Sequence, residues 1–92
     1  LAHDVLAGRS VPQAVGAALA DPDATVVVGE LNGAALGIGM ARIDQRRMAA
    51  TVELLYVEPD ARAVGLGEVM LDALAAWAGS RGCTALDAAA LP

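Results

Sequence analysis

A strand-like run, a glycine turn, a long helix and a second strand follow one another in this chain and constrain its fold most. Thr51–Val57 is rich in β-forming residues and indicates a strand, which Glu58 and Pro59 end. A Gly-x-Gly turn then opens an amphipathic helix from Gly65 to about Ser80, and Cys83–Ala88 indicates a short second strand. A strand, a helix and a strand in this order predict a βαβ unit with parallel strands and a right-handed crossover.

The segments before this unit predict an antiparallel hairpin and a helix. Thr25–Glu30 and Ala34–Asp44 indicate two strands, and Asn32-Gly33 between them is typical of a type I′ turn. Glycines at positions 37 and 39 of the second strand suggest a bulge or the close approach of another backbone. Ser10 can cap a helix that runs to about Ala20, and a shorter helix is expected at Ala2–Gly8. The fold class is therefore α/β (α+β), with a mixed sheet.

Composition limits the size of the core and the kind of partner. The chain has 92 residues, of which 57% are hydrophobic, with one Trp, one Tyr and no Phe. One small domain is expected over residues 1–92, with a thin aliphatic core. The net charge of −5 argues against nucleic-acid binding, and no apolar run is long enough to cross a membrane. The chain begins at Leu1 and stops at Leu91-Pro92 after a strand-like run, so we expect a partial domain.

The few soft ligands in the chain exclude several chemistries. A single cysteine, Cys83, cannot form an internal disulfide, which fits a reducing, cytoplasmic compartment. Cys83 is expected to be a small core residue, and His3, alone near a terminus, to be a surface residue. With one His and one Cys, no metal site is expected.

The turn before the long helix has several interpretations. Backbone N–H groups and the helix dipole make a glycine turn at a helix start suitable for a phosphate or pyrophosphate. A dinucleotide fingerprint would have a third glycine where this chain has Met70, and it would follow its strand directly. A Walker-type loop requires a lysine, and the chain has none. Glycines that merely turn the chain, or a nucleotide-binding fragment of another α/β enzyme, stay open as alternatives.

The segment from Leu55 to Leu74 resembles the central motif of the GNAT superfamily, the acyl-CoA-dependent N-acyltransferases. That motif runs V-x-P-x-x-[QR]-x-x-G-x-G-x-x-L-[LM]. Its elements here are Val57, Pro59, Arg62, Gly65, Gly67, Met70 and Leu71. The order of helices and strands agrees with the family from about Val11 to Asp87, although the specific part covers only about twenty residues. The chain departs from the pattern at Ala63-Val64, where family members commonly carry a glycine and a basic residue.

The resemblance implies a site for a coenzyme A thioester, with acetyl-CoA as the cosubstrate. The exposed backbone of Leu55 and Val57 would pair with the pantetheine arm, and an amide near Tyr56 could stabilise the oxyanion of the thioester. The amine acceptor would attack directly, without a covalent enzyme intermediate. The pyrophosphate would lie at the turn that Arg62 precedes, against the backbone amides of Ala63, Val64, Gly65, Leu66, Gly67 and Glu68.

Glu53 is the candidate for the base that accepts a proton from the amine, directly or through water. Strand alternation predicts that it shares a face with Leu55 and Val57 and that Tyr56 points to the opposite face, as a core or edge aromatic. The alternative for Glu53 is a carboxylate at a sheet margin paired with an arginine. Glu30 and Asp44, on neighbouring strand ends, are weaker candidates. The tyrosine that protonates the thiolate in many family members lies on a helix beyond this segment, so no residue is assigned to that role.

Two functions follow from the resemblance. The first is an N-acetyltransferase that acts on a primary amine of a small molecule or protein. The second is a non-catalytic module of the same fold that binds coenzyme A, regulates or dimerises. An unpaired edge at the last strand would favour a homodimer in either case.

Overall fold

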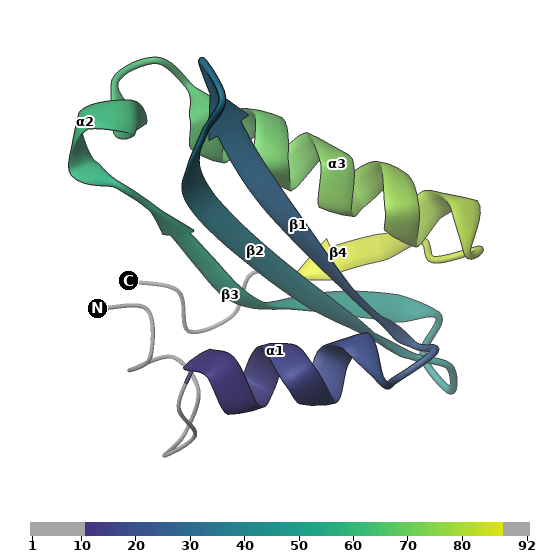
Figure 1. Ribbon diagram of the computed structural model, residues 1–92. Coiled ribbons are helices and arrows are strands. Elements are labelled where there is room, and N and C mark those ends of the chain that lie inside the picture. Colours follow the sequence, from purple (N-terminus) through teal and green to yellow (C-terminus); the bar gives the residue numbers. More distant parts are fainter. Residues whose placement is uncertain (1–10, 88–92) are drawn as a thin grey trace.

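The computed structural model describes residues 11–87, and the side chains from residue 13 onward. The helix expected at Ala2–Gly8, together with His3, lies outside the described residues. Figure 1 shows one twisted sheet between two helices, with α1 across one face and α3 along the other. The elements are α1 (Val11–Leu19), β1 (Ala24–Leu31), β2 (Ala34–Asp44), β3 (Ala49–Val57), α2 (Pro59–Arg62), α3 (Leu66–Ser80) and β4 (Ala85–Asp87).

The sheet has the mixed topology that the sequence predicts. Its strand order is β1-β2-β3-β4, with antiparallel pairing up to β3 and parallel pairing between β3 and β4. Asn32 and Gly33 have φ angles of 53° and 83°, the positive values that a type I′ turn requires, so the predicted hairpin is confirmed. The last strand is shorter than the expected Cys83–Ala88, because Cys83 and Thr84 lie in the loop that leads into it. Ala88 lies outside the described residues.

A short helix, α2, lies between the end of β3 and the glycine turn, where no helix was predicted. Pro59 stands at its start, where a fixed φ and a missing N–H are tolerated, and Asp60 lies in its first turn. Ala61 is 1% exposed and packs with Val57 and the first turns of α3. The chain between β3 and α3 is therefore a packed element, which fixes where α3 begins.

The two faces of the sheet carry separate apolar layers. On one face, Ala14 and Ala18 of α1 pack on Met40 and Leu54. On the other face, α3 packs its buried side chains on β2 and β3. These side chains are Leu66, Met70, Leu74 and Ala78.

Glycines in β1 and β2 allow α3 to lie close to the sheet. A Cβ added at Gly29 or at Gly37 would lie 2.7 Å from the sulfur of Met70. At Gly37 the same Cβ would also lie 3.1 Å from the carbonyl oxygen of Tyr56. The close approach expected at Gly37 is therefore present, and a helix side chain as well as a strand backbone makes it. The start of α3 is thereby seated directly beside the end of β3.

Candidate functional site

The outer edge of β3 is only partly covered by β4. Three residues of each strand are paired, namely Ala49, Ala50 and Thr51 with Ala85, Leu86 and Asp87. Within residues 11–87, the rest of β3 has a partner strand on its β2 side alone. The second half of β3 therefore presents one edge of its backbone next to the turn that leads into α3.

The hydrogen-bond alternation of the sheet indicates which backbone groups point to that edge. The Glu58 N–H donates to the Leu36 carbonyl oxygen at 2.8 Å, which makes this a hydrogen-bonded position between β2 and the end of β3. Because such positions alternate along an antiparallel pair, Tyr56 faces β2, and Leu55 and Val57 direct their N–H and C=O groups to the other edge. These are the two residues whose backbone groups are predicted to pair with the pantetheine arm.

Arg62 confirms the direction of the Val57 carbonyl and closes the segment. Its Nε–H donates to the Val57 carbonyl oxygen at 2.9 Å, so that α2 is tied back to the end of β3. The guanidinium is thereby held at the start of the turn, where an anion would meet it. A direct contact between Arg62 and a cofactor stays a prediction.

The turn into α3 presents backbone amides at a helix start. Gly65 is the N-cap with φ 79° and ψ 18°, a conformation that residues with a Cβ rarely adopt, and the space where a Cβ would stand is open. Val69 makes the first bond of the helix, from its N–H to the Gly65 carbonyl at 3.2 Å. The amides of Leu66, Gly67 and Glu68 precede that bond and therefore point out of the helix end, where the dipole adds positive charge.

The other amides assigned to the pyrophosphate are engaged within the turn. The N–H groups of Val64 and Gly65 donate to the carbonyls of Ala61 and Arg62, both at 3.4 Å, and Ala63 is the C-cap of α2. These distances are long for N–H···O bonds, so the two bonds are weak. Three of the six assigned residues therefore offer amides that precede the helix bonds.

The structure corrects the face on which Glu53 lies. Met40 pairs with Leu54 but Ala41 pairs with Val52, so Glu53 is the extra residue of a β-bulge. Val52 packs with Leu74 of α3, as Leu55 does, and so the bulge breaks the simple alternation. The prediction that Glu53 shares a face with Leu55 and Val57 is wrong, because one extra residue inverts the pattern.

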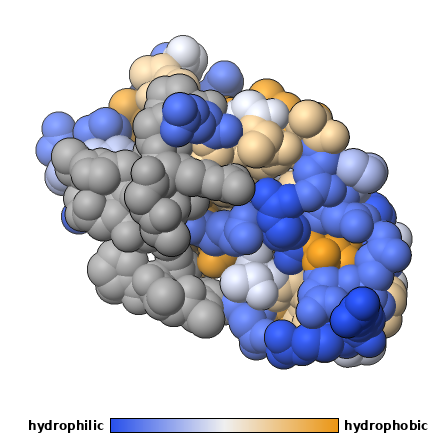
Figure 2. Space-filling model, turned by 90° about the horizontal axis from the view of Figure 1, so that it is seen from below, coloured by the Kyte–Doolittle hydropathy of each residue, from blue (hydrophilic) through white to orange (hydrophobic). Residues whose placement is uncertain are grey.

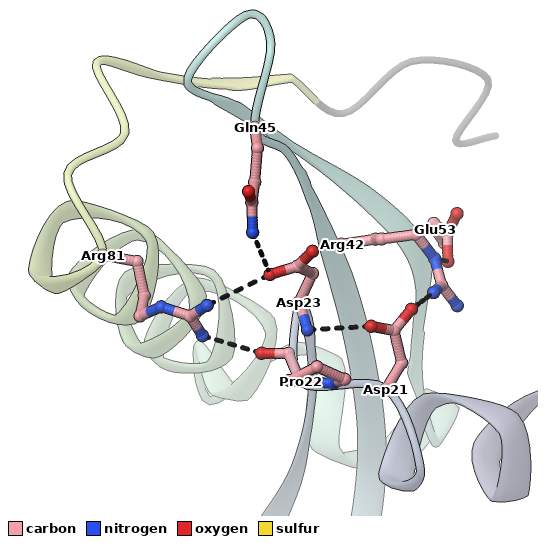
Figure 3. A network of polar contacts seen from close by, with 7 residues as sticks. All are labelled: Asp21, Pro22, Asp23, Arg42, Gln45, Glu53 and Arg81. Carbon is pink, nitrogen blue, oxygen red and sulfur yellow. Dashed lines mark hydrogen bonds and ion pairs between the residues drawn. The ribbon is translucent and has the colours of Figure 1, made fainter.

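Glu53 instead meets an arginine on the α1 face. Arg42 lies between two residues that face α3, and its Nε–H donates to Glu53 Oε1 at 3.2 Å. The same guanidinium pairs with Asp21, in the turn after α1 (Figure 3). The pairing with an arginine that the sequence analysis gave as the alternative is therefore present.

Tyr56 also lies on the α1 face, so its predicted separation from Glu53 is wrong as well. It is opposite Ile38, which packs against the α1 cluster, and both line an open hollow of the sheet. Of the weaker candidates, Glu30 pairs with Ala35 at the same end of the sheet as the turn. Asp44 pairs with Ala49 at the opposite end, away from the turn.

A second polar cluster joins Asp23, Gln45 and Arg81. Arg81 donates to Asp23 Oδ1 at 3.2 Å and to the Pro22 carbonyl at 2.9 Å, and Gln45 donates to the same carboxylate oxygen at 2.8 Å. Figure 3 shows these side chains converging from three separate segments. Figure 2 shows, on its right, that this end of the molecule is mostly hydrophilic. An arginine partner for Glu53 was the one part of these clusters that the sequence suggested, because the other partners lie far apart along the chain.

A family comparison explains why an amide-lined turn follows a strand whose second half has one partner strand among residues 11–87. The model of the Acetyltransferase (GNAT) family matches residues 6–91, nearly the whole chain. The chain belongs to the GNAT acetyltransferase family. None of the curated proteins compared with it gives a significant match.

Solved structures share the GNAT fold with this chain. The chain superposes on AAC(6′)-Iy in complex with the bisubstrate analog CoA-S-monomethyl-acetylneamine, with a TM-score of 0.78, 18% identity, and coverage of 100% of this chain and 69% of that chain. A protein from Staphylococcus aureus described as a GNAT family acetyltransferase gives 0.73 at 21% identity, covering 82% of this chain and 62% of that one. The aminoglycoside 6′-N-acetyltransferase AAC(6′)-Ig from Acinetobacter haemolyticus gives 0.73 at 24% identity, covering 86% and 61%. The chain thus spans about two thirds or less of these GNAT structures.

Two further observations concern metals and membranes. Among the described residues of this GNAT chain, no three His, Cys, Asp or Glu side chains converge in a way that could hold a metal ion. None of the helices within residues 11–87 has the length and apolar character needed to span a bilayer.

Proposed function

We propose that this GNAT domain is an N-acetyltransferase that binds acetyl-CoA along the outer edge of β3 and transfers the acetyl group to a primary amine. The observation that carries the proposal is the continuity between two features. The outward backbone groups of Leu55 and the outward N–H of Val57, whose carbonyl oxygen accepts from Arg62, lead directly to the open amides at the start of α3. In a coenzyme A thioester the acyl group, the pantetheine arm and the pyrophosphate follow one another, so the arm would lie along the strand edge and the pyrophosphate at the turn.

The reaction requires little covalent chemistry from the protein. The neutral amine attacks the thioester carbonyl, a C–N bond forms, the C–S bond breaks, and the thiolate leaves as coenzyme A. An outward N–H of the β3 edge, from Leu55 or Val57, would donate to the carbonyl oxygen as negative charge develops there. The Leu66–Glu68 amides and the helix dipole would hold the pyrophosphate and so fix the position of the reacting carbonyl.

Glu53 is the proposed base for the proton that the amine loses, directly or through a water molecule. Its bond to Arg42 fixes the position of its carboxylate on the α1 face, the face that also carries Tyr56. The same bond supports a second candidate function, a GNAT module that binds coenzyme A without catalysis. In that case, Glu53 serves only to pair with Arg42.

Calorimetric titration with acetyl-CoA tests the donor site. We expect binding by the native chain and a loss of about 100-fold or more in Gly65→Asp, since a carboxylate would then lie against the pyrophosphate. Gly33→Asp is the matched control, because Gly33 also has a positive φ of 83° and open space around it. An equal loss in both variants, or an equal affinity for NAD, would contradict the proposal.

Thiol release with acetyl-CoA and a panel of primary amines tests the role of Glu53. The variant Glu53→Gln keeps an oxygen for Arg42, so we expect slower turnover by about 100-fold with unchanged acetyl-CoA binding. Asp44→Asn removes a carboxylate at the end of β2 and serves as the control. Unchanged turnover in Glu53→Gln removes Glu53 from the mechanism, and no turnover in the native chain favours the non-catalytic module.

A further inference from the structure

An open hollow of about 300 Å³ lies on the α1 face of the sheet, beside the end of β3. It begins at Ile38, which packs against the buried cluster beneath α1, and it includes Val28, whose exposed fraction is 55%. Its lining comes from Val28, Ala35, Leu36, Gly37, Ile38, Tyr56 and Glu58, of which Leu36 also packs with the buried cluster on the α3 side. The hollow is thus an apolar floor with one phenol and one carboxylate.

The carboxylates of this hollow lie at its margin. Glu58 lines it and is exposed, directly after the end of β3. Glu30 is exposed and pairs with Ala35, a residue of the lining, so its side chain lies on the same face of the sheet. An apolar surface bordered by two carboxylates is complementary to a ligand with an apolar body and one ammonium group.

The charged side chains described at this end of the molecule are mostly acidic. Glu58, Asp60 and Glu68 are exposed around the turn, and Arg62 is the one described arginine there. The other described arginines lie at the opposite end of the sheet, at the end of β2, in the turn after it and after α3. A cationic acceptor is therefore attracted to the end where the proposed donor site lies.

The hollow also meets the proposed donor site along β3. Tyr56 lines the hollow with its side chain, while its neighbours Leu55 and Val57 turn their backbone groups to the outer edge. An amine seated over Tyr56 would thus approach a thioester on that edge from the α1 face. Glu53 lies on this face too, so that the proposed base and the hollow are on the same side of the sheet.

We propose that this hollow is the acceptor site and that it takes a small monoamine with an apolar body, of the arylalkylamine type. This inference rests on the proposed acetyltransferase function. A volume of about 300 Å³ is at the lower limit of ligand pockets and suits one ring with a short chain. A polyhydroxylated, multi-ring aminoglycoside would press its hydroxyl groups against Val28 and Ile38 without hydrogen-bond partners.

Binding measured by NMR on the native chain tests the inference without requiring turnover. The probe is 2-phenylethylamine, compared with ethanolamine, which lacks the ring, with 2-phenylethanol, which lacks the charge, and with neamine. We expect shifts at Val28, Ile38 and Tyr56 and an affinity about tenfold higher for 2-phenylethylamine than for each comparator. Equal or tighter binding of neamine or ethanolamine, shifts confined to another surface, or no binding at millimolar concentration would overturn it.

Variants of the lining separate the apolar and the ionic contributions. Val28→Ser should weaken 2-phenylethylamine about five- to tenfold, whereas Leu19→Ser, at a side chain that is 73% exposed on α1, should change nothing. Glu58→Gln should reduce the preference for the amine over 2-phenylethanol. Equal effects of the two serine variants, or an unchanged preference in Glu58→Gln, would contradict the inference.

The donor titration and sedimentation distinguish the remaining outcomes. If acetyl-CoA binds but 2-phenylethylamine does not, this inference fails and the proposed function stands. If acetyl-CoA does not bind, the proposed function itself fails. A concentration-dependent dimer that Val28→Ser dissociates would assign the hollow to a second copy of the chain and overturn the acceptor site.

Discussion

The two ends of the sheet use their polar groups in opposite ways. At the end where β2 turns into β3, carboxylates and guanidinium groups pair with one another, as Arg42 does with Asp21 and Glu53. At the other end, the turn between α2 and α3 leaves the amides of Leu66–Glu68 ahead of the first helix bond. At the first end the polar side chains hold elements of the fold together, whereas at the second end the backbone amides at the start of α3 are open to a ligand.

From this contrast we expect variants at the two ends to affect different measurements. Variants at the paired end should lower the free energy of unfolding and leave the binding of acetyl-CoA unchanged. Variants at the turn end should weaken the binding of acetyl-CoA and leave the free energy of unfolding unchanged, except where buried packing supports the turn.

The largest effect is expected at Gly29 under α3, where a substitution should reduce both the free energy of unfolding and the binding of acetyl-CoA. A Cβ there would lie 2.7 Å from the sulfur of Met70 and 3.0 Å from two carbons of Leu66. Gly29→Ala should therefore cost about 1–3 kcal/mol in thermal or urea unfolding and also weaken acetyl-CoA binding, because it displaces the first turns of α3. The control is Gly79→Ala within α3, where an added Cβ would meet nothing within 4 Å, so this variant should stabilise the chain by about 1 kcal/mol at most. Equal stability of the two variants would refute this reading of the packing.

The next effect is expected at Arg42, and it should sharpen the contrast. Arg42→Gln removes two charge-assisted pairs and leaves Asp21 and Glu53 near each other, with side chains about one third exposed. We expect a loss of about 1–2 kcal/mol in urea unfolding and an acetyl-CoA affinity that stays within about twofold of the native value. Arg46→Gln, at an exposed turn residue, should leave both measurements unchanged. A large loss of binding in Arg42→Gln would show that the two ends are coupled.

A smaller effect is expected at Arg62, at the turn end. Arg62→Ala loses the bond to the Val57 carbonyl, so the start of the turn is held less firmly. We expect acetyl-CoA binding to weaken by about three- to tenfold in calorimetry while unfolding changes by about 1 kcal/mol or less. Arg47→Ala is the control, since its 3.7 Å pair with Asp87 is well exposed and lies away from the turn. Unchanged binding with a large loss of stability would instead show that Arg62, like Arg42, serves to hold elements of the fold together.

The smallest effect is expected from the donor itself. The described side chains around the turn are mainly acidic, and Ala63-Val64 provides no cation. Removal of the 3′-phosphate, by comparing acetyl-CoA with its 3′-dephospho form, should therefore change the affinity by about threefold or less. A loss of more than about tenfold would show that a cation reaches the nucleotide.

Much of the fold follows from local signals in the sequence. Asn32-Gly33 specifies the hairpin because its φ angles suit few other residue pairs, and Gly65 marks the start of α3 for the same reason. The parallel placement of β4 follows from chain order alone. The short helix α2 could not be predicted from periodicity, because four residues are too few to show one.

The side-chain partners of the candidate site could not be predicted as well as its backbone. Motif spacing places the turn and the strand edge next to each other, since both depend on backbone geometry. Arg42 and Asp21 are 21 residues apart, and no local pattern announces their contact. Glu53 was placed on the wrong face because a bulge adds one residue without any special residue type to mark it.

The bulge at Glu53 has a consequence for how this strand can change. Ala50 and Val52 face α3 before it, and Leu55 and Val57 face α3 after it, although their spacing along the chain is odd across the bulge. The bulge at Glu53 shifts the alternation of side chains along the strand by one residue. Loss of Glu53 would leave Met40 opposite Leu54 and Ala41 opposite Val52 in a regular ladder, so the side chains on both sides of the bulge would keep their faces. The bulge is thus an insertion that the ladder could lose, and it places a carboxylate beside Arg42 without disturbing either apolar layer.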